Sequence, residues 1–320
     1  MSSLYHYCSN EKCFSILRGK TIRLSDIQKS NDYMEMSLFF PEIIDIIEEQ
    51  YLKAPFPLKY KNLHDQDALL EMTNISYDYW KKRFDNGDFS NFVVCFSEKA
   101  DTLSQWRGYA DNGKGCCIGF SKQLLLEYCK MNKSILTMQK VEYLTEEQIH
   151  NRILYKAKEC LDSIKLLREW IVDNMTHDDN SPDTDNLLHF NFDGILSSVF
   201  NGSLGMKSKA FSEEKEWRIF FQRGAYKNPE WVCRKDNDIL IGPEGFSETV
   251  DFLNNKIQFQ VSDNDIIPFY PIGFDEFSTN PVTELWIGPK SNIRPKDIEL
   301  FLRQNGYKNT KAIYSRITYC

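Results

Sequence analysis

Short hydrophobic or alternating stretches near both ends of the chain are typical of β-strands. The apolar run at residues 92–97 stops at polar positions and is expected to be a buried strand. The same kind of pattern predicts further strands at residues 4–8, 21–24, 116–120, 139–143, 214–222, 230–234, 239–241, 257–261, 284–287 and 311–318. Because strands lie at both ends and helices mainly between them, the pattern favours an α+β fold.

Hydrophobic residues at helical spacing fill the stretches between these strands. The longest such pattern begins at Ile149, and Thr145 forms a capping box with the glutamine three residues later. Shorter helices are expected at residues 10–19, 41–52, 66–84, 102–109, 122–128, 187–200 and 295–304. We therefore expect one α+β domain over residues 1–320, with helical insertions at residues 35–90 and 144–205.

Residues 92–120 combine a strand, a short helix that Asp101 can cap, a glycine turn and a second strand. The turn is expected to bring the two strands together. The polar and aromatic side chains of this stretch are Ser97, Gln105, Trp106, Arg107 and Tyr109. Such a mixture suits a ligand cleft, because pockets combine an aromatic lining with a few polar groups. A core hairpin with one helical turn packed on it is the alternative interpretation.

A second informative stretch is KSKAFSEEKEWRIFF at residues 207–221. If residues 214–222 form one continuous strand, Glu214, Glu216 and Arg218 share one face of it. Two glutamates and an arginine held by a rigid strand form a candidate catalytic group. The alternative is a solvated strand face with ion pairs of little energetic weight.

Composition is that of a globular protein with a sizeable core, with 42% hydrophobic and 27% charged residues. The net charge of −7 argues against a protein that coats duplex DNA. One segment differs from this balance, because residues 290–316 carry seven Lys or Arg against Asp297 and Glu299. A local basic surface can bind nucleic acid, and a solvated helix face with a terminal strand is the alternative.

The chain has nine cysteines, an odd number, and none of them forms a CxxC pair. This usage predicts free thiols in a reducing compartment. A zinc cluster of His6, Cys8 and Cys13 fits no common ligand spacing. The first residues lack a signal-peptide pattern, and no run of about 18 apolar residues occurs, so a cytoplasmic protein is expected.

The chain lacks the GxxxxGK[ST], GxGxxG, GxSxG and HExxH motifs, which argues against the common nucleotide kinases, hydrolases and zinc proteases. The segments LYHYCS, SNDYMEM, SQWRGYADNGKGCCIGF, EEKEWR and ELWIGPKSN occur in this order. In this respect the chain resembles the bacterial domain-of-unknown-function family 2971, from Leu4 to about Tyr319. The family name supplies no reaction.

A more distant resemblance is to ADP-ribosyltransferase domains, through the YH strand, the following helix and the IRLS segment. In that superfamily three strands supply the site: a His or Arg, then an aromatic or Ser, then a Glu. His6, Ser97 with Tyr109, and Glu216 fall in this order. The resemblance implies a split mixed or antiparallel sheet with helical insertions. Where the family has Ser-Thr-Ser in its middle motif, this chain has Cys-Phe-Ser.

The resemblance implies an NAD-dependent ADP-ribosyltransferase or NAD glycohydrolase, with NAD as substrate and no metal. Cleavage of the nicotinamide bond passes through an oxocarbenium-like state, which a carboxylate stabilises. Glu216 would supply that carboxylate, Glu214 would orient or deprotonate the acceptor, and His6 would bind the adenosine ribose. The expected NAD-binding residues are Tyr7, Arg23, Ser97, Trp106, Arg107, Tyr109 and Arg218.

The expected acceptor is a protein or a nucleic acid, and no membrane partner is expected. This class suits a bacterial toxin or a phage-defence effector. A nuclease or nucleic-acid binder and a non-catalytic sensor module are the alternatives. We further expect residues 106–109 to face the strand of Glu216 across one cleft. Tyr109 then contacts NAD, whereas Trp106 belongs mainly to the core.

Overall fold

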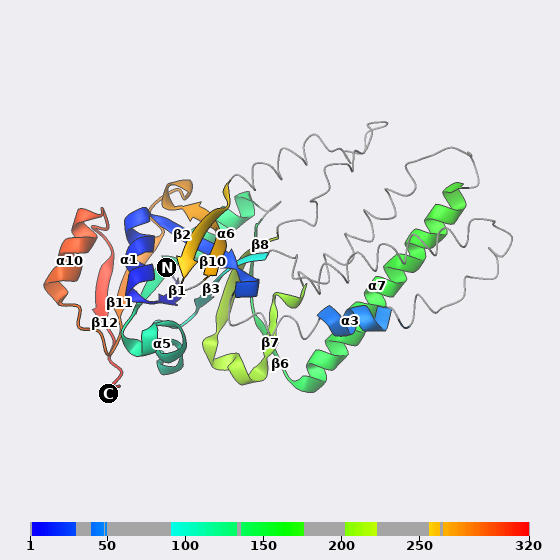
Figure 1. The fold of residues 1–320 in the computed structure, drawn as a ribbon, viewed down its shortest axis with the longest axis horizontal. Coiled ribbons are helices and arrows are strands. Elements are labelled where there is room, and N and C mark those ends of the chain that lie inside the picture. Colours follow the sequence, from blue (N-terminus) through cyan, green and yellow to red (C-terminus); the bar gives the residue numbers. More distant parts are fainter. Residues whose placement is uncertain are drawn as a thin grey trace.

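The computed structural model describes residues 2–29, 40–47, 49, 91–132, 136–175, 202–222, 256–262 and 265–319 (Figure 1). Within these residues the chain forms a ten-stranded sheet, a separate two-stranded sheet and several helices. Most neighbouring strands of the large sheet are antiparallel, and β11 with β12 is its parallel pair. The fold is therefore α+β, as the sequence predicts.

The large sheet is built from segments far apart in the chain. Its strands are β1 (Ser3–Cys8), β2 (Thr21–Asp26), β3 (Asn91–Ser97), β4 (Cys116–Ser121), β5 (Leu136–Lys140), β8 (Glu216–Gln222), β9 (Gln258–Ser262), β10 (Asp265–Gly273), β11 (Val282–Ile287) and β12 (Lys311–Tyr314). Their order is β12-β11-β4-β1-β3-β2-β10-β9, and β8 lies between β3 and β5. The small sheet pairs β6 (Glu142–Leu144) in parallel with β7 (Met206–Ser208).

The helices begin largely where the sequence predicts. They are α1 (Asn10–Gly19), α3 (Phe40–Ile47), α5 (Leu103–Tyr109), α6 (Lys122–Met131), α7 (Glu146–Met175) and α10 (Pro295–Gln304). Short 3-10 turns follow at η1 (Ile27–Lys29), η4 (Asp111–Gly113), η5 (Lys209–Glu214) and η6 (Phe274–Glu276). Ser9 caps α1, and the Thr145–Gln148 capping box before α7 is present in both directions.

Several strand predictions need correction. Residues 139–143 are not one strand, because the chain leaves β5 at Val141 and enters β6. The sequence analysis missed β10, whose prolines Pro268 and Pro271 argue against a strand by composition. The predicted helices at residues 66–84 and 187–200 and the predicted strands at residues 230–234 and 239–241 lie outside the described residues.

The predicted hairpin between residues 92–97 and 116–120 is wrong, because β1 lies between β3 and β4. Cys8 pairs with Cys116 on one side of β1, and Tyr5 pairs with Ser97 on the other. The glycine turn lies under the end of β1 instead. A Cβ atom on Gly115 would collide with the carbonyl oxygen of Cys8, so only glycine fits there.

Two hydrophobic clusters lie on opposite faces of β1. Leu4 and Cys8 belong to the main core, which α1, α6 and α10 cover. Tyr7 belongs to a smaller cluster with Trp106 of α5. This division follows the alternation of β1 side chains that the sequence predicts.

The strands β1 and β3 share one residue pair and then part. That pair is Tyr5 with Ser97. Farther along β3, the neighbour is β2, through Ser25 with Val93. His6 lies where β1 and β3 part, and its Nδ1 atom is 2.9 Å from the Cys95 carbonyl oxygen. The parting of the strands leaves room for a cavity at this end of β3.

Within the ranges predicted as insertions, the structure describes the helices α3 and α7. In Figure 1, α7 extends away from the large sheet. The helix α3 packs against α7. The Oε1 atom of Glu42 in α3 lies 3.5 Å from the Nδ1 atom of His150 in α7. None of the described helices is long and apolar enough to cross a membrane.

Candidate functional site

A small cavity of about 80 Å³ lies where β1, β3, α5 and η5 meet. It is lined by Tyr5, His6, Tyr7, Cys95, Phe96, Ser97, Gln105, Tyr109, Glu214 and Glu216. Seven of these residues are candidates from the sequence: His6, Tyr7, Ser97, Gln105, Tyr109, Glu214 and Glu216. The cavity therefore brings together predicted residues that are more than 200 positions apart in the chain.

Ser97 holds the centre of this arrangement through the sheet. It pairs with Tyr5 of β1 on one side and with Glu216 of β8 on the other. Its Oγ atom donates a 2.6 Å hydrogen bond to the carbonyl oxygen of Glu214. The same hydroxyl accepts from the backbone N–H of Lys99 at 3.1 Å. Ser97 is thus buried and fixes η5 against the end of β3.

Glu214 does not belong to the strand of Glu216, contrary to the sequence prediction. It is the last residue of η5, and Lys215 follows it in the left-handed conformation with a φ of 48°. The strand β8 begins only at Glu216. The backbone reversal at Lys215 means that strand alternation cannot place both carboxylates on one face. They approach each other because of this turn instead.

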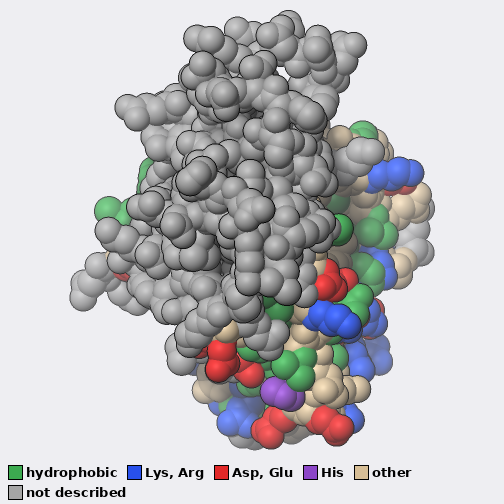
Figure 2. Space-filling model, turned by 90° about the vertical axis from the view of Figure 1, so that its right-hand side faces the viewer, with side chains coloured by type: hydrophobic (Ala, Val, Ile, Leu, Met, Phe, Trp, Pro, Cys, Tyr) green, Lys and Arg blue, Asp and Glu red, His purple; other side chains and the backbone are tan. Residues whose placement is uncertain are grey.

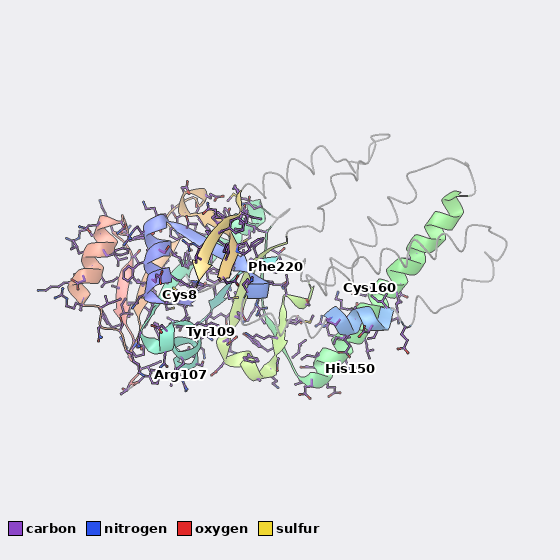
Figure 3. The ribbon with its side chains drawn as sticks, in the orientation of Figure 1. Cys8, Arg107, Tyr109, His150, Cys160 and Phe220 are labelled. Atoms are coloured by element: carbon purple, nitrogen blue, oxygen red, sulfur yellow. The ribbon has the colours of Figure 1, made fainter. Side chains whose placement is uncertain are left out.

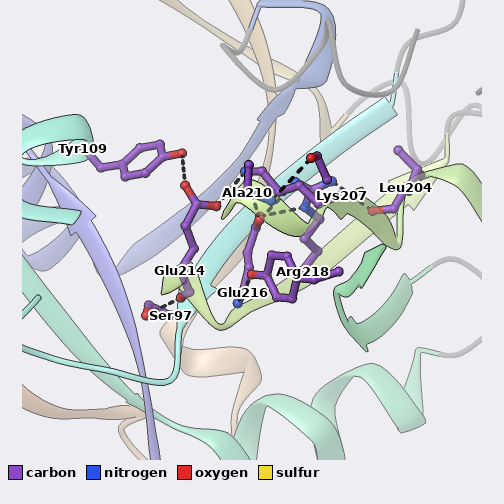
Figure 4. A network of polar contacts seen from close by, with 10 residues as sticks. Ser97, Tyr109, Leu204, Lys207, Ala210, Glu214, Glu216 and Arg218 are labelled. Carbon is purple, nitrogen blue, oxygen red and sulfur yellow. Dashed lines mark hydrogen bonds and ion pairs between the residues drawn. The ribbon is translucent and has the colours of Figure 1, made fainter. Parts of the chain in front are cut away.

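The side chain of Glu214 bridges the cavity and a buried lysine (Figure 4). Its Oε1 atom accepts a 2.9 Å hydrogen bond from the Tyr109 hydroxyl, and its Oε2 atom is 2.6 Å from Lys207 Nζ. Tyr109 comes from α5 and remains 39% exposed, whereas Lys207 is 1% exposed. Of residues 106–109, Tyr109 makes a contact with Glu214, whereas Trp106 packs against Tyr7.

Glu216 is held as an ion. Arg218 Nε donates to its Oε1 atom at 2.6 Å, and Arg218 Nη2 donates to its Oε2 atom at 3.1 Å. Burial disfavours the charge of Glu216, but Arg218, Lys207 and the Cys95 thiol outweigh burial and lower the pKa of this carboxyl below its usual value. Arg218 is fully buried and also donates to the Leu204 carbonyl oxygen.

His6 is half-buried and neutral at pH 7. Burial lowers the pKa of its imidazole below the usual value, and Lys12 adds to this effect, against the hydrogen bond to Cys95. A carbonyl oxygen only accepts, so Nδ1 carries the proton in the bond to Cys95. Nε2 then has a lone pair and no hydrogen-bond partner among the described residues.

Two of the predicted NAD-binding residues, Tyr7 and Trp106, make contacts within the fold itself. The Tyr7 hydroxyl donates to the Lys99 carbonyl oxygen and accepts from the Thr102 N–H, although Tyr7 also lines the cavity. Trp106 is fully buried, and its Nε1 atom donates to Asp101 at 2.7 Å. Asp101 is therefore not the helix cap that the sequence suggested, since Thr102 occupies that position without a side-chain bond.

Arg23 and Arg107, two of the predicted NAD-binding residues, are not part of the cavity lining. Arg23 donates to Gln260 and Ser15 and lies over the Phe269 ring. Arg107 belongs to α5, as Tyr109 does (Figure 3), but its side chain is exposed. Arg218 is also absent from the lining and acts on the cavity through Glu216.

Sequence reasoning missed Lys207, Cys95 and Tyr143. Lys207 contacts both glutamates, Cys95 lines the cavity, and the Tyr143 hydroxyl accepts a 2.7 Å bond from the Glu216 N–H. A charge argument could have found Lys207. Two glutamates with one arginine leave an excess negative charge, so their burial requires a second cation.

The other predicted features lie elsewhere. Within residues 290–316, Arg294 pairs with Asp297, and Lys290 lies over the Tyr319 ring. On the face of the molecule in Figure 2, the visible described side chains include both charge signs, interspersed. The seven cysteines that the structure describes are free thiols, and no group of three or more His, Cys, Asp or Glu among the described residues could hold a metal ion.

The comparison with family models bears on the part of the chain that contains α5, Glu214 and Glu216. Residues 105–219 match DUF2971, a family of proteins of unknown function. The match includes α5 and the segment of Glu214 and Glu216, and it confirms the resemblance to family 2971 over that range. A search of curated proteins finds no match to the chain, and a search of solved structures finds none either.

Proposed function

We propose that this protein binds NAD at the cavity and cleaves its nicotinamide glycosidic bond, as an ADP-ribosyltransferase or an NAD glycohydrolase. The observation that carries the proposal is the arrangement of three strands. His6, Ser97 and Glu216 lie on β1, β3 and β8, and Ser97 is the residue at which β3 pairs with both β1 and β8. This is the order of residue types that ADP-ribosyltransferase domains distribute over three strands.

The parting of β1 and β3 supports the finer assignment of the fold. The strands share the pair Tyr5 with Ser97, and the cavity lies where they separate. We assign the sheet to the split, ADP-ribosyltransferase-like type on this basis. NAD would then enter between the separated strands, as a ligand does at the mouth of a divided sheet.

The carboxylates suit the chemistry of the bond that breaks. Nicotinamide leaves with the bonding electron pair, and the ribose carbon develops positive charge that a fixed carboxylate stabilises. Glu216 is held ionised by Arg218, and it supplies this negative charge. Glu214 borders the cavity beside Tyr109, where it would orient the attacking water or acceptor hydroxyl and accept its proton.

The size of the cavity gives the proposal a further requirement. About 80 Å³ is well below the roughly 300–1,000 Å³ of common ligand pockets. NAD binding must therefore open the site. Tyr109 is the partly exposed lining residue whose hydroxyl bonds Glu214 across the cavity, so we expect NAD to displace this hydrogen bond.

Purified protein should release nicotinamide from NAD, or transfer ADP-ribose to a member of a panel of proteins, RNA and DNA. Glu214→Gln should lose most of this turnover. Glu213→Gln is the matched control, because Glu213 is the exposed neighbour in η5. No turnover by the wild-type chain across the panel would overturn the proposal. Turnover that survives Glu214→Gln would leave the activity standing and move its site elsewhere.

A further inference from the structure

Lys207 is the buried cation between the two glutamates of the cavity. Its Nζ atom lies 2.6 Å from Glu214 Oε2 and 3.4 Å from Glu216 Oε2. It also lies 4.9 Å from the centre of the Phe211 ring, so the ammonium has an aromatic contact as well. The short strand β7 carries Lys207 into this position by pairing with β6.

The two cations of the site have different tasks. Arg218 makes a two-point contact with Glu216 and is anchored by the Leu204 carbonyl oxygen. Among the residues that the structure describes, the cation that contacts Glu214 is Lys207. A shared ammonium lets two carboxylates lie close together while both stay ionised, since like charges otherwise force one of them to bind a proton.

We propose that Lys207 is a positioning residue of the cavity, which pairs its charge with both Glu214 and Glu216 and holds Glu214 toward Tyr109. The proposal deepens the proposed function and rests on it for the catalytic use of the carboxylates. The geometry gives Lys207 both contacts at once, at 2.6 Å from Glu214 Oε2 and 3.4 Å from Glu216 Oε2. A lysine is a compact point charge with rotatable donors, which suits two separate carboxylates better than the planar arginine fork does.

The titratable and charged groups around Glu214 and Glu216 come from several elements. They are His6 on β1, Cys95 on β3, Tyr109 on α5, Tyr143 on β6, Lys207 on β7 and Arg218 on β8. Lys207 and Arg218 are the permanent cations of this set. Loss of Lys207 therefore leaves Arg218 to balance two carboxylates, and the pair must take up a proton at a higher pH than before.

The pH dependence of melting temperature tests the proposal without NAD. Lys207→Met removes the charge but keeps an unbranched apolar stem. The variant should melt lower than the wild type, and the loss should be about 5 °C larger at pH 8 than at pH 5, because a proton replaces the missing cation at low pH. Lys209→Met, at an exposed position of η5, is the matched control and should show no such difference.

A double variant separates charge from packing. Lys207→Met combined with Glu214→Gln removes one charge of each sign, so it should melt higher than Lys207→Met alone at pH 8. Should Lys207→Met fail to fold, a folded double variant still supports the proposal. An equal loss of melting temperature at both pH values, or a double variant no better than the single one, would overturn it.

Turnover provides a second readout for the same variant. The acid limb of the pH–rate profile should move to higher pH in Lys207→Met, with turnover falling about tenfold for each pH unit below the new midpoint. An unmoved acid limb would overturn the positioning role. If the melting pattern appears and the wild type has no NAD turnover, the proposed function fails and the charge pairing by Lys207 stands.

Discussion

Two carboxylate centres lie at opposite ends of α5, and they differ in the donors that surround them. Asp101 precedes the helix and accepts from Trp106 Nε1, Ser315 Oγ and the Arg316 N–H. All three donors are neutral. Glu214, near the other end of α5, accepts from the Tyr109 hydroxyl and from the ammonium of Lys207. The second centre borders the cavity of about 80 Å³.

This difference separates scaffold from site. The Asp101 bonds join the start of α5 to the C-terminal segment, and the indole of Trp106 fills the small core beside Tyr7. These bonds hold the helix in place with neutral donors alone, and they include no cationic side chain. Buried ion pairs are weak contributors to stability, because desolvation offsets much of their attraction. The cations at Glu214 and Glu216 are therefore better explained by what the carboxylates do in the cavity.

The largest effect should come from removing the core residue of the Asp101 centre. Trp106→Ala deletes a fully buried indole that packs edge to face on Tyr7. We expect a loss of about 3–5 kcal/mol of unfolding free energy, measured by urea denaturation. Any NAD-induced rise in melting temperature should survive in the folded fraction. A loss below about 1 kcal/mol would contradict the assignment of Trp106 to the scaffold.

Glu216→Gln should break the ionic centre at a cost of about 3 kcal/mol, because it leaves Arg218 buried beside a neutral amide. The pKa of Glu216 is lowered in the folded protein, so its charge stabilises the fold above the unfolded value of about 4.3. This contribution is lost as pH falls through the lowered folded pKa. The difference between variant and wild type should thus be constant from about pH 6 to 8 and shrink below about pH 4.

Urea denaturation at several pH values measures this difference. A gap that stays the same at pH 3 and pH 7 would mean that the charge of Glu216 contributes nothing, and the centre would then resemble that of Asp101. Glu213→Gln, at an exposed position of η5, is the matched control, because it makes the same substitution at a carboxylate outside the buried centre.

Asp101→Ala should cost less, about 1–3 kcal/mol, because it leaves the Trp106 N–H without its acceptor and releases the segment at Ser315. Ser315→Ala removes one of the same bonds and should cost about 1 kcal/mol. Hydrogen exchange on α5 should rise in both variants. Unchanged exchange on α5 in Asp101→Ala would show that the C-terminal segment does not hold this helix.

Local sequence patterns predicted where helices and strands lie in the chain better than they predicted which strands pair with each other. The cap at Ser9 and the capping box at Thr145 depend on residues close in the chain, and both are present. The position of β1 between β3 and β4 depends on pairing across about 90 to 110 residues, which no local pattern encodes. The turn at residues 111–115 looked like a hairpin turn because its composition fits one.

The candidate site was partly predictable for the same reason. Glu214 and Glu216 stood out as charges beside an apolar run, but strand alternation gave the wrong geometry, because Lys215 adopts a left-handed conformation. A non-glycine residue rarely does so, and nothing in its identity signals it. The local pattern gave Lys207 no role, and its burial follows from the pairing of β7 with β6.

The smallest effect on stability, and the sharpest test of the comparison, concerns Tyr109. Its ring is partly exposed, and its hydroxyl donates a hydrogen bond to Glu214 in the site. Tyr109→Ala should therefore cost about 1 kcal/mol or less of unfolding free energy. Tyr109→Phe keeps the ring and removes the hydroxyl, so it should cost less still and leave Glu214 with one partner fewer.

The two Tyr109 variants should differ in their response to NAD. If the ring stacks on a bound base, Tyr109→Ala loses the NAD-induced rise in melting temperature, whereas Tyr109→Phe keeps it. Tyr109→Phe should even bind NAD more readily, because NAD no longer has to displace the bond to Glu214. Trp106→Ala, three residues away on the same helix, supplies the comparison. An equal loss of melting temperature in Trp106→Ala and Tyr109→Ala, with the NAD-induced rise unchanged in both, would make the whole of α5 scaffold and leave the cavity without a ligand contact from this helix.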